Sequence, residues 1–389
     1  MADADQWRVF IADTLTGQIR ADVAYTGEPT FDRTLSDKGS LTVSTYISGP
    51  NAQVDFHTYT RPGMYSWILA YGTSIVQAGP VWSYQFTDDS RTLAVTCGGM
   101  FSLFSRRVTR NPLGSANDAV PAIVNESEDL NYTGMSLRGI MRALVADNLA
   151  QLDYGMPSII LPEVTETGEN ERHYMAYDLK MLADNMTDLA GVINGPEFDF
   201  APEFNAAGTY VQWRLKIGSP LLGDQESTNV WDYGTEGAPI NTIDVDVDGS
   251  DSPITRVWVK GDGTERGLLT GFAEDLSRVH AGYPGTDYVD GDHTSATEQQ
   301  TLEDYADQDL ETLSTATETW TCDVRITGPG AVEYAPSLHN WQLGDAPLFA
   351  LANHPWLPDG AYRRRVLGYA NSSPSSVKLT LADTPETVI

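Results

Sequence analysis

Short runs in which apolar and polar residues alternate occupy the first 110 residues of the chain. These runs lie at 7–12, 19–23, 41–47, 65–71, 75–78, 81–86 and 92–97, with Gly, Asp and Ser in several of the stretches between them. A period of two residues is typical of strands, because successive side chains point to opposite faces of a sheet. Closely spaced strands joined by such turns predict a small antiparallel barrel or sandwich.

The spacing of apolar residues becomes helical after residue 135. Ser136 is a suitable N-cap, and the apolar positions that follow it recur at helical intervals as far as Leu149. A second helix is expected from near Asp178 to Gly191, with one apolar stripe formed by Leu179, Leu182, Met186 and Leu189. A strand pair is expected next, at 197–200 and 210–217, so this middle part of the chain is predicted to be α+β.

Strand patterns return in the remainder of the chain, at 240–247, 254–259, 320–326, 347–352, 363–369 and 377–381. Residues 261–297 are rich in Gly, Asp and Thr, which predicts an exposed excursion. A third helix is expected at about 298–318, and its apolar side consists of Leu302, Tyr305, Ala306, Leu310 and Leu313.

The predicted fold class is mainly β with an α+β insert: two small antiparallel β-barrels plus a helix-containing domain. A chain of 389 residues is long enough for two to four domains. We expect a first barrel at 1–112, an α+β domain at 113–237, a discontinuous second barrel at 238–262 with 319–389, and a loop-and-helix excursion at 263–318.

The net charge of −30 is distributed very unevenly. Residues 1–110 and 319–389 are each close to neutral, whereas residues 111–318 hold 38 acidic and 10 basic side chains. A field of that sign repels phosphate, so we expect no specific or general binding of nucleic acid. The acidity is equally compatible with a role in solubility alone.

Two cysteines, Cys97 and Cys322, lie in alternating apolar runs, which predicts buried thiols and gives no support to a disulfide. The start, MADADQWRVFIAD, has acids where a secretory signal needs basic residues, so we expect synthesis in a cytoplasm and no export by the general secretory route. No apolar run approaches the ~18 residues of a membrane span, so no stable membrane insertion is expected.

One segment resembles the first half of a calcium-binding loop. Asp244, Asp246 and Asp248 precede Gly249 in a D-x-D-x-D-G pattern, but the twelfth position is Thr255 where such loops have glutamate. Apolar residues alternate with these acids, as in a strand with one solvated face. We favour the solvated strand and retain the three aspartates as metal candidates.

No other motif indicates a reaction or a cofactor. The six histidines are scattered, and no zinc-binding, phosphate-binding or nucleophile-elbow pattern occurs. Acidic residues are so frequent that any pair could be proposed as general acid and base, which makes such a choice uninformative. We therefore expect no catalytic residue and no cofactor.

Two basic clusters stand out: Arg106-Arg107 with nearby Arg110, and Arg363-Arg364-Arg365. Solvated arginines, ion pairs across an interface and contact with DNA are all open interpretations, the last being the least favoured because the protein is acidic. The first cluster follows Met100, Phe101, Leu103 and Phe104.

The order of these pieces resembles the baseplate hub proteins of tailed phages, whose core also occurs in the spike proteins of type VI secretion. The N-terminal part is most similar to minor tail proteins of long-tailed phages of actinobacteria. The carrying segments are WRVFIADTLTGQI, FDRTLSDKGSLTVS, SYQFTDDSRTLAVTCGGMFSLFSRRV, SLRGIMRALV, YDLKMLADNMTDLAGV and EYAPSLHNWQLGDAPLFAL. Together they extend over nearly the whole chain, but 261–297 matches nothing in the family.

The resemblance implies barrels of the tail-tube type and a homotrimeric ring in the virion, at the tail tip. Two barrels per copy would match a sixfold tube above, and DNA would only pass through. Implied partners are a distal tail or tail-tube ring, the tape measure protein and the tip or receptor-binding proteins. Met100, Phe101 and Phe104 would cap the barrel end or meet a neighbouring subunit. Both arginine clusters would lie at interfaces, with Arg106 and Arg107 pairing with acids of the insert or the next copy.

Two other classes of function stay open. One is a β-rich hydrolase of carbohydrates, which needs a cleft with two suitably spaced carboxylates. The other is a binding module for carbohydrate or Ca²⁺, the latter using the acidic strand at 244–248.

Overall fold

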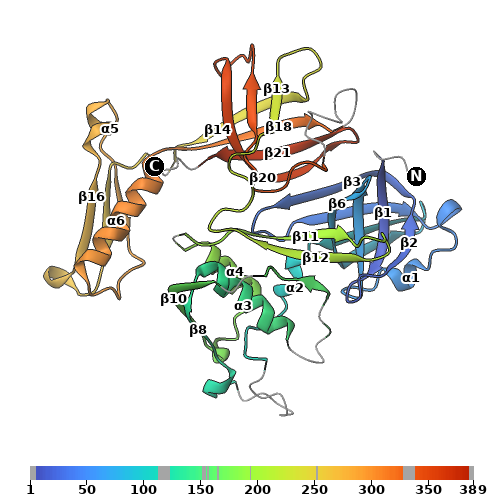
Figure 1. Cartoon of the computed structure of the whole chain (residues 1–389), viewed down its shortest axis with the longest axis horizontal. Coiled ribbons are helices and arrows are strands. Elements are labelled where there is room, and N and C mark those ends of the chain that lie inside the picture. Colours follow the sequence, from blue (N-terminus) through green and yellow to red (C-terminus); the bar gives the residue numbers. More distant parts are fainter. Residues whose placement is uncertain are drawn as a thin grey trace. The chain divides into compact units, whose positions relative to one another are not determined.

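The computed structural model describes residues 6–112, 123–150, 155, 157–163, 166–192, 194–250, 253–326 and 338–384. The chain forms two compact units: Met1–Ile243 with Cys322–Ile389, and Asp244–Thr321. The fold is mainly β, as predicted (Figure 1). None of the described helices has the length and apolar character needed to span a bilayer. The four-part domain division predicted from the sequence stays a prediction.

The first part of the larger unit is a barrel-like sheet in the order β3-β4-β7-β6-β5-β1-β2. Its strands are β1 (Trp7–Asp13), β2 (Ile19–Val23), β3 (Tyr25–Thr34), β4 (Ser40–Tyr46), β5 (Tyr65–Tyr71), β6 (Ser74–Thr87) and β7 (Thr92–Gly98). Its short helices are η1 (Gly49–Asn51), α1 (Phe56–Tyr59) and α2 (Phe101–Phe104). The strands expected here are confirmed, and β3 is an additional one.

Strand β6 joins two of the predicted strands into one of 14 residues. Gly79 lies between the two strands predicted at 75–78 and 81–86. A Cβ atom there would lie 1.8 Å from the carbonyl oxygen of Gly98 on β7, so only glycine allows the two strands to approach this closely.

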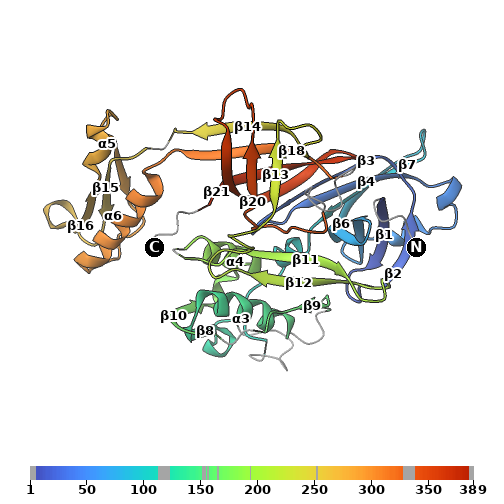
Figure 2. The ribbon, with the colours of Figure 1, turned by 45° about the horizontal axis from the view of Figure 1, so that its top comes forward.

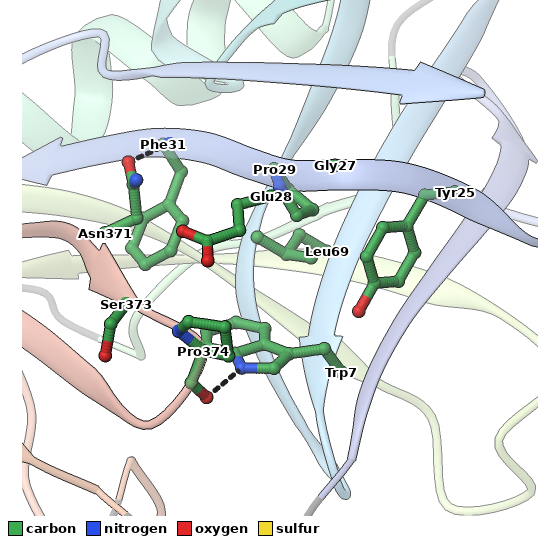
Figure 3. Close-up of a pocket in the computed structure, with 10 residues that line it drawn as sticks. All are labelled: Trp7, Tyr25, Gly27, Glu28, Pro29, Phe31, Leu69, Asn371, Ser373 and Pro374. Atoms are coloured by element: carbon green, nitrogen blue, oxygen red, sulfur yellow. Dashed lines mark hydrogen bonds between the residues drawn. The ribbon is translucent and has the colours of Figure 1, made fainter.

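Strands β2 and β3 are not hydrogen-bonded to each other, although residues 6–112 are all described. Aromatic packing bridges this side of the barrel, where the rings of Trp7 and Phe31 lie 5.8 Å apart. A small hollow of about 100 Å³ remains beside them, between β1, β3 and the β20–β21 turn (Figure 3).

The α+β insert covers one face of the first barrel. Its strands are β8 (Leu130–Met135), β9 (Ile159–Ile160), β10 (Thr167–Tyr174), β11 (Phe198–Phe204) and β12 (Val211–Ile217), paired as β10-β8 and β11-β12-β9. Its helices are α3 (Leu137–Leu149) and α4 (Leu182–Ala190), with the short turns η2 (Glu126–Glu128) and η3 (Ala176–Asp178).

One of the two insert helices begins where the sequence predicted, and the other begins later. The cap of α3 is confirmed, since the Ser136 hydroxyl accepts the Gly139 N–H at 3.0 Å. Helix α4 begins at Leu182, four residues later than predicted. Leu179 has a left-handed backbone with φ of 50° and ends the preceding turn η3, so it is half exposed and absent from the apolar stripe.

The second barrel is closed, in the strand order β19-β13-β14-β18-β21-β20, with β20 also pairing with β19. Its strands are β13 (Val230–Tyr233), β14 (Ile240–Asp248), β18 (Thr317–Arg325), β19 (Leu348–Leu351), β20 (Gly360–Ser373) and β21 (Ser376–Asp383). Strand β13 runs parallel to both of its neighbours. The strands predicted in this part are all confirmed, and β13 is an additional strand that was not predicted.

Both barrels belong to one 13-stranded sheet, because β20 pairs with β3 (Figure 2). The register places Gly368, Tyr369 and Ala370 opposite Thr34, Arg33 and Asp32. Hydrogen bonds between β20 and β3 therefore join the two barrels side by side into one wall.

In the smaller unit, the stretch at 261–297 that was predicted as an exposed excursion is mostly exposed but contains strands and short helices that were not predicted. Its strands are β15 (Arg256–Lys260), β16 (Thr270–Glu274) and β17 (Asp287–Asp290), and its helices are η4 (Glu265–Gly267), α5 (Leu276–His280) and α6 (Gln299–Leu313). The sheet, in the order β16-β15-β17, packs with α6 around a core of its own. Strand β15 was predicted at 254–259, whereas β16 and β17 were missed because they are short and lie among Gly and Asp residues.

Candidate functional site

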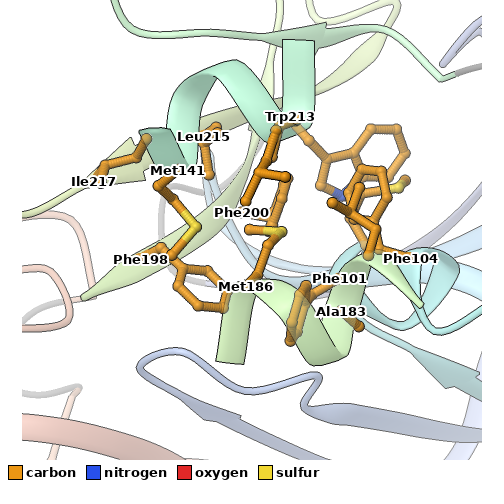
Figure 4. Packing of buried hydrophobic residues seen from close by; sticks show 14 of the residues in the cluster. Phe101, Phe104, Met141, Ala183, Met186, Phe198, Phe200, Trp213, Leu215 and Ile217 are labelled. Atoms are coloured by element: carbon orange, nitrogen blue, oxygen red, sulfur yellow. The ribbon is translucent and has the colours of Figure 1, made fainter. Parts of the chain in front are cut away.

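The apolar residues predicted at an interface lie in the core between the first barrel and its insert. Met100, Phe101 and Phe104 are each 3% exposed or less. The Phe101 ring lies 4.8 Å from that of Phe198, and the Phe104 ring lies 5.2 Å from that of Phe200 (Figure 4). Of the two roles expected for these side chains, contact with a neighbouring subunit does not fit, because their surface is already buried within one copy, whereas capping of the barrel end stays a prediction.

The backbone before α2 explains how these rings reach the insert. A Cβ on Gly98 would lie 2.5 Å from the Ser102 hydroxyl, and one on Gly99 would lie 2.3 Å from the Lys38 carbonyl oxygen. The two glycines therefore let β7 turn tightly into the helix. The Ser102 hydroxyl donates to Gly99 O and accepts the Trp82 indole N–H, which fixes the turn.

The first arginine cluster makes several contacts within its own chain, and its predicted pairing with acids of the insert or the next copy stays a prediction. Arg106 is exposed, and its guanidinium lies 3.9 Å from the ring centroid of Trp82, a cation–π contact. The backbone carbonyl of Arg107 accepts the Leu182 N–H that begins α4. Arg110 pairs with the fully buried Glu128 at 3.2 Å. These contacts anchor the segment after α2 to its own chain.

The second arginine cluster ties the second barrel together and to the insert. Arg365 makes a two-bond ion pair with Glu197 at 2.5 and 3.0 Å, and only 5% of its side chain is exposed. Arg363 donates to the carbonyl oxygens of Ser227 and Ala346, and Arg364 pairs with Asp383. An ion pair across an interface is present for Arg365, but that interface lies inside one copy of the chain.

A third ion pair, which the sequence did not reveal, joins all three parts of the larger unit. Arg33 on β3 pairs with Asp199 on β11 at 2.6 Å and donates to the Tyr369 hydroxyl on β20 at 3.3 Å. Burial by itself lowers the pKa of Arg33, but Asp199 and Tyr369 more than offset this and raise it. These residues line a hollow of about 400 Å³ together with Lys216, whose pKa burial lowers.

The metal candidates lie along one strand. Asp244, Asp246 and Asp248 are all exposed on β14, which confirms the solvated strand face. Asp248 accepts from Ser250, and this lowers its pKa. Among the residues that the structure describes, no group of three or more His, Cys, Asp or Glu side chains could hold a metal ion. Asp251 lies outside the described residues.

Both cysteines are buried and unbridged, as the alternating runs predicted. Burial raises the pKa of the Cys97 thiol to about 12, so this group stays protonated and unreactive at neutral pH.

The outer face of the shared sheet is the most distinctive surface of the larger unit. Strand β4, strand β7 and residues 82–87 of β6 are neighbours in the sheet and contain no charged residue. Their inward side chains, such as Leu41, Val43 and Val95, fill the barrel. Their outward side chains carry mainly hydroxyl or amide groups: Ser40, Thr42, Ser44, Thr92, Thr96, Ser83, Gln85 and Thr87.

The pattern does not continue past the junction between the barrels. On β21 the buried residues Val377, Leu379 and Leu381 alternate with outward ones that include Lys378 as well as Thr380. On β18 the outward residues Asp323 and Arg325 are charged. We therefore call only the outward surface of β4, β7 and residues 82–87 of β6 the hydroxyl face. In a protein of net charge −30, three neighbouring strand segments without a charged residue are unexpected.

The open face of the smaller unit carries exposed aromatic residues. Trp258, Phe272 and Val289 occupy one register across the three strands, and all are more than a third exposed. The Trp258 and Phe272 ring centroids lie 4.4 Å apart, and the Trp258 indole N–H donates to Asp287. Arg256 pairs with Glu274 at 3.1 Å beside them. Helix α6 packs against the opposite face.

The fold is shared with solved tail proteins, two of which come from prophages, at very low sequence identity. The 43 kDa tail protein of a Shewanella oneidensis prophage aligns with a TM-score of 0.59 and 9% identity, over 97% of this chain and 98% of that one. A tail protein of Neisseria meningitidis aligns with a TM-score of 0.54 and 13% identity, over 97% and 96%. A prophage tail protein of Listeria monocytogenes aligns with a TM-score of 0.51 and 9% identity, over 98% and 96%. No protein-family model and no curated protein sequence matches the chain.

Proposed function

We propose that this chain is a structural subunit of a phage tail tip, a baseplate hub protein that assembles as a ring. Three copies, each with two barrels, place six barrels around an axis and adapt a sixfold tail tube to threefold tip components. The full-length similarity of fold to prophage tail proteins supports this role. The role requires no reaction, and the proposal includes no catalytic residue and no cofactor.

The observation that carries the proposal is the continuous sheet with its hydroxyl face. Hydrogen bonds between β20 and β3 make the two barrels one wall, so three copies suffice to surround a passage with six similar segments. We assign the hydroxyl face to the inside of that passage. Ser and Thr side chains offer neither the fixed cations that retain phosphate nor a dense row of carboxylates.

The distribution of charge supports this orientation. The smaller unit alone has 18 acidic and 4 basic residues, and 14 of those acids lie outside the barrel strands β14 and β18. In the proposed ring, DNA touches the lining only in transit. The tail tube or a distal tail ring, the tape measure protein and the tip or receptor-binding proteins are the proposed partners, and the virion tail is the proposed location. The proposal includes a phage of actinobacteria only because the N-terminal segment resembles minor tail proteins of such phages.

The mass and shape of the purified protein test the ring. We expect light scattering to give three times the chain mass, and electron microscopy to show a threefold torus with an open axis. If the protein alone is a monomer, co-expression with its neighbouring tail proteins is the second measurement. A monomer that stays out of tail particles in both experiments contradicts the proposal.

A lysine pair tests the assignment of the lining. Thr42→Lys with Thr96→Lys places two cations per copy on the hydroxyl face, where the two hydroxyls lie 3.4 Å apart. We expect the assembled ring to retain double-stranded DNA in a salt-dependent way, whereas the wild-type ring does not. The matched control is Thr301→Lys with Thr312→Lys, on the exposed side of α6. Equal retention by both variants contradicts the assignment.

The open face of the smaller unit favours a second candidate function, a carbohydrate-binding module. Trp258 and Phe272 present ring faces against which sugar C–H groups can stack, and Asp287, Glu274 and Arg256 supply hydrogen-bonding groups beside them. Binding of purified bacterial wall polysaccharide, lost on Trp258→Ala, supports this candidate. Unchanged binding in that variant, or none in the wild type, contradicts it.

A further inference from the structure

The small hollow beside the first barrel is walled by aromatic rings. Trp7, Tyr25 and Phe31 line it together with Leu69 and Glu28, and the β20–β21 turn borders it on one side (Figure 3). The hollow measures about 100 Å³, which suits one small organic group. It lies wholly within one copy of the larger unit.

The rings are held in place by contacts outside the hollow. The Trp7 indole N–H donates to the Pro374 carbonyl oxygen at 2.8 Å, and its ring lies 5.0 Å from that of Tyr71. The buried Phe31 ring packs edge-on against Tyr369 at 5.9 Å. Two walls are therefore preorganised, which reduces the entropy cost of binding.

A distortion of β3 brings a carboxylate to the same place. Thr26 pairs with Ser44 and Thr30 with Thr42, so three residues of β3 oppose one residue of β4. Gly27 has φ of 68° within this bulge, a conformation that glycine adopts without strain. The bulge frees Glu28 from the strand ladder, and its side chain lines the hollow together with Trp7 and Phe31 (Figure 3).

Glu28 has no charged partner in the part of the chain that the structure describes. Among the described residues, no cation forms an ion pair with it, and no donor forms a hydrogen bond with its carboxylate. Three carboxylates in more buried places of the larger unit, those of Asp199, Glu197 and Glu128, are by contrast paired with arginine. A carboxylate among aromatic rings without a cation marks this place as different.

We propose that this hollow is an aromatic cage that binds an alkylammonium group. Ring faces carry negative electrostatic potential and attract a cation, and the Glu28 carboxylate adds direct charge attraction. An anion would be repelled by Glu28, and a neutral ligand would gain only burial of apolar surface. A lysine side chain of another protein and a choline-type headgroup share this chemistry. All residues that line the site belong to one copy of the chain, so the proposal does not depend on the proposed ring.

Three probes, of which choline and its neutral analogue are matched in size, distinguish charge from shape. Choline represents the quaternary headgroup, Nα-acetyl-lysine amide represents a protein side chain, and 3,3-dimethylbutanol is the neutral analogue of choline. Calorimetric titration of the intact protein gives the three dissociation constants. We expect at least one cation to bind about five- to thirtyfold more tightly than the neutral probe, the range of a partly desolvated cation–π contact. The tighter of the two cations identifies the source.

Variants locate the binding. Glu28 is exposed, so Glu28→Gln should fold normally and weaken cation binding about three- to tenfold, with the neutral probe unaffected. Glu236→Gln, at another exposed position, is the matched control and should leave all three constants unchanged. Trp7→Leu should abolish the preference for cations. Equal affinity for the neutral probe, no binding of either cation, or cation binding that neither variant alters overturns the proposal.

Discussion

The sheets of the two compact units are buried in different ways. All seven residues of β5 in the larger unit are buried, because one face lines the barrel and the other packs on the insert. In β15 of the smaller unit, only Val257 and Val259 are buried, and Arg256, Trp258 and Lys260 face outward. A covered sheet contributes to stability on both faces, whereas an open face is free for another role.

The comparison also shows where sequence pattern is ambiguous. YSWILAY is apolar at nearly every position, as expected of a strand with two buried faces. RVWVK has an aromatic residue at an outward position, and its sequence alone cannot separate an exposed tryptophan from a buried one. The structure separates them by showing that α6 packs on one face only.

The largest expected effect lies in the covered region. Phe101→Ala removes a ring from the core between barrel and insert, and should lower the free energy of unfolding by about 3–5 kcal/mol. Urea denaturation followed by circular dichroism measures it. If the loss is small and only self-association changes, then Phe101 belongs to a subunit interface after all, and the covering layer is not what buries this side of the barrel.

The next effect concerns the ion pair between the insert and the second barrel. Arg365→Met leaves the Glu197 carboxylate without its partner, and should cost about 2–3 kcal/mol, less than a fully buried pair because Glu197 is partly exposed. The double variant with Glu197→Leu should recover part of this loss. If the loss in the double variant equals the sum of the losses in the two single variants, the two side chains do not stabilise each other.

Substitutions on the open face of the smaller unit should change the free energy of unfolding only slightly. Trp258→Ala should change the free energy of unfolding by under about 1 kcal/mol, whereas Leu302→Ala, in the core under the same sheet, should cost about 2–4 kcal/mol. Thermal unfolding of both variants gives the ratio. A larger loss at Trp258 than at Leu302 would mean that the exposed rings serve the fold, which removes the contrast between the two sheets.

The smallest effect tests how the covering layer is held. A hydrogen bond from the Ser136 hydroxyl, followed by one from Arg138, keeps the pKa of Glu166 below its ordinary value. A lowered folded-state pKa adds stability above the unfolded pKa of about 4.5, and this stability is lost as pH falls through the folded value. In Glu166→Gln the free energy of unfolding should therefore fall less on acidification, by under about 1 kcal/mol. A plot of melting temperature against pH should be less steep on its acid side than that of the wild type, and an unchanged slope contradicts this assignment.

Local pattern was a good guide to most strands and to the start of α3. It failed where backbone geometry broke the period, as at Leu179, and where short strands lie among Gly and Asp, as in β16 and β17. It also assigned Met100, Phe101 and Phe104 to a possible contact between subunits, since an apolar run at a domain edge has the same pattern whether its partner belongs to the same chain or to another.

The sequence by itself determined the alternation of the strands, the capped helix, the buried thiols and the neutral ends around an acidic middle. Those features depend on neighbours within a few residues, which the chain order specifies. Only the tertiary structure decided that Arg33 meets Asp199, that Arg365 meets Glu197, and that β20 joins β3 into one wall. Such pairs are more than 160 residues apart, and a periodic pattern states which face of an element is buried but not what covers it.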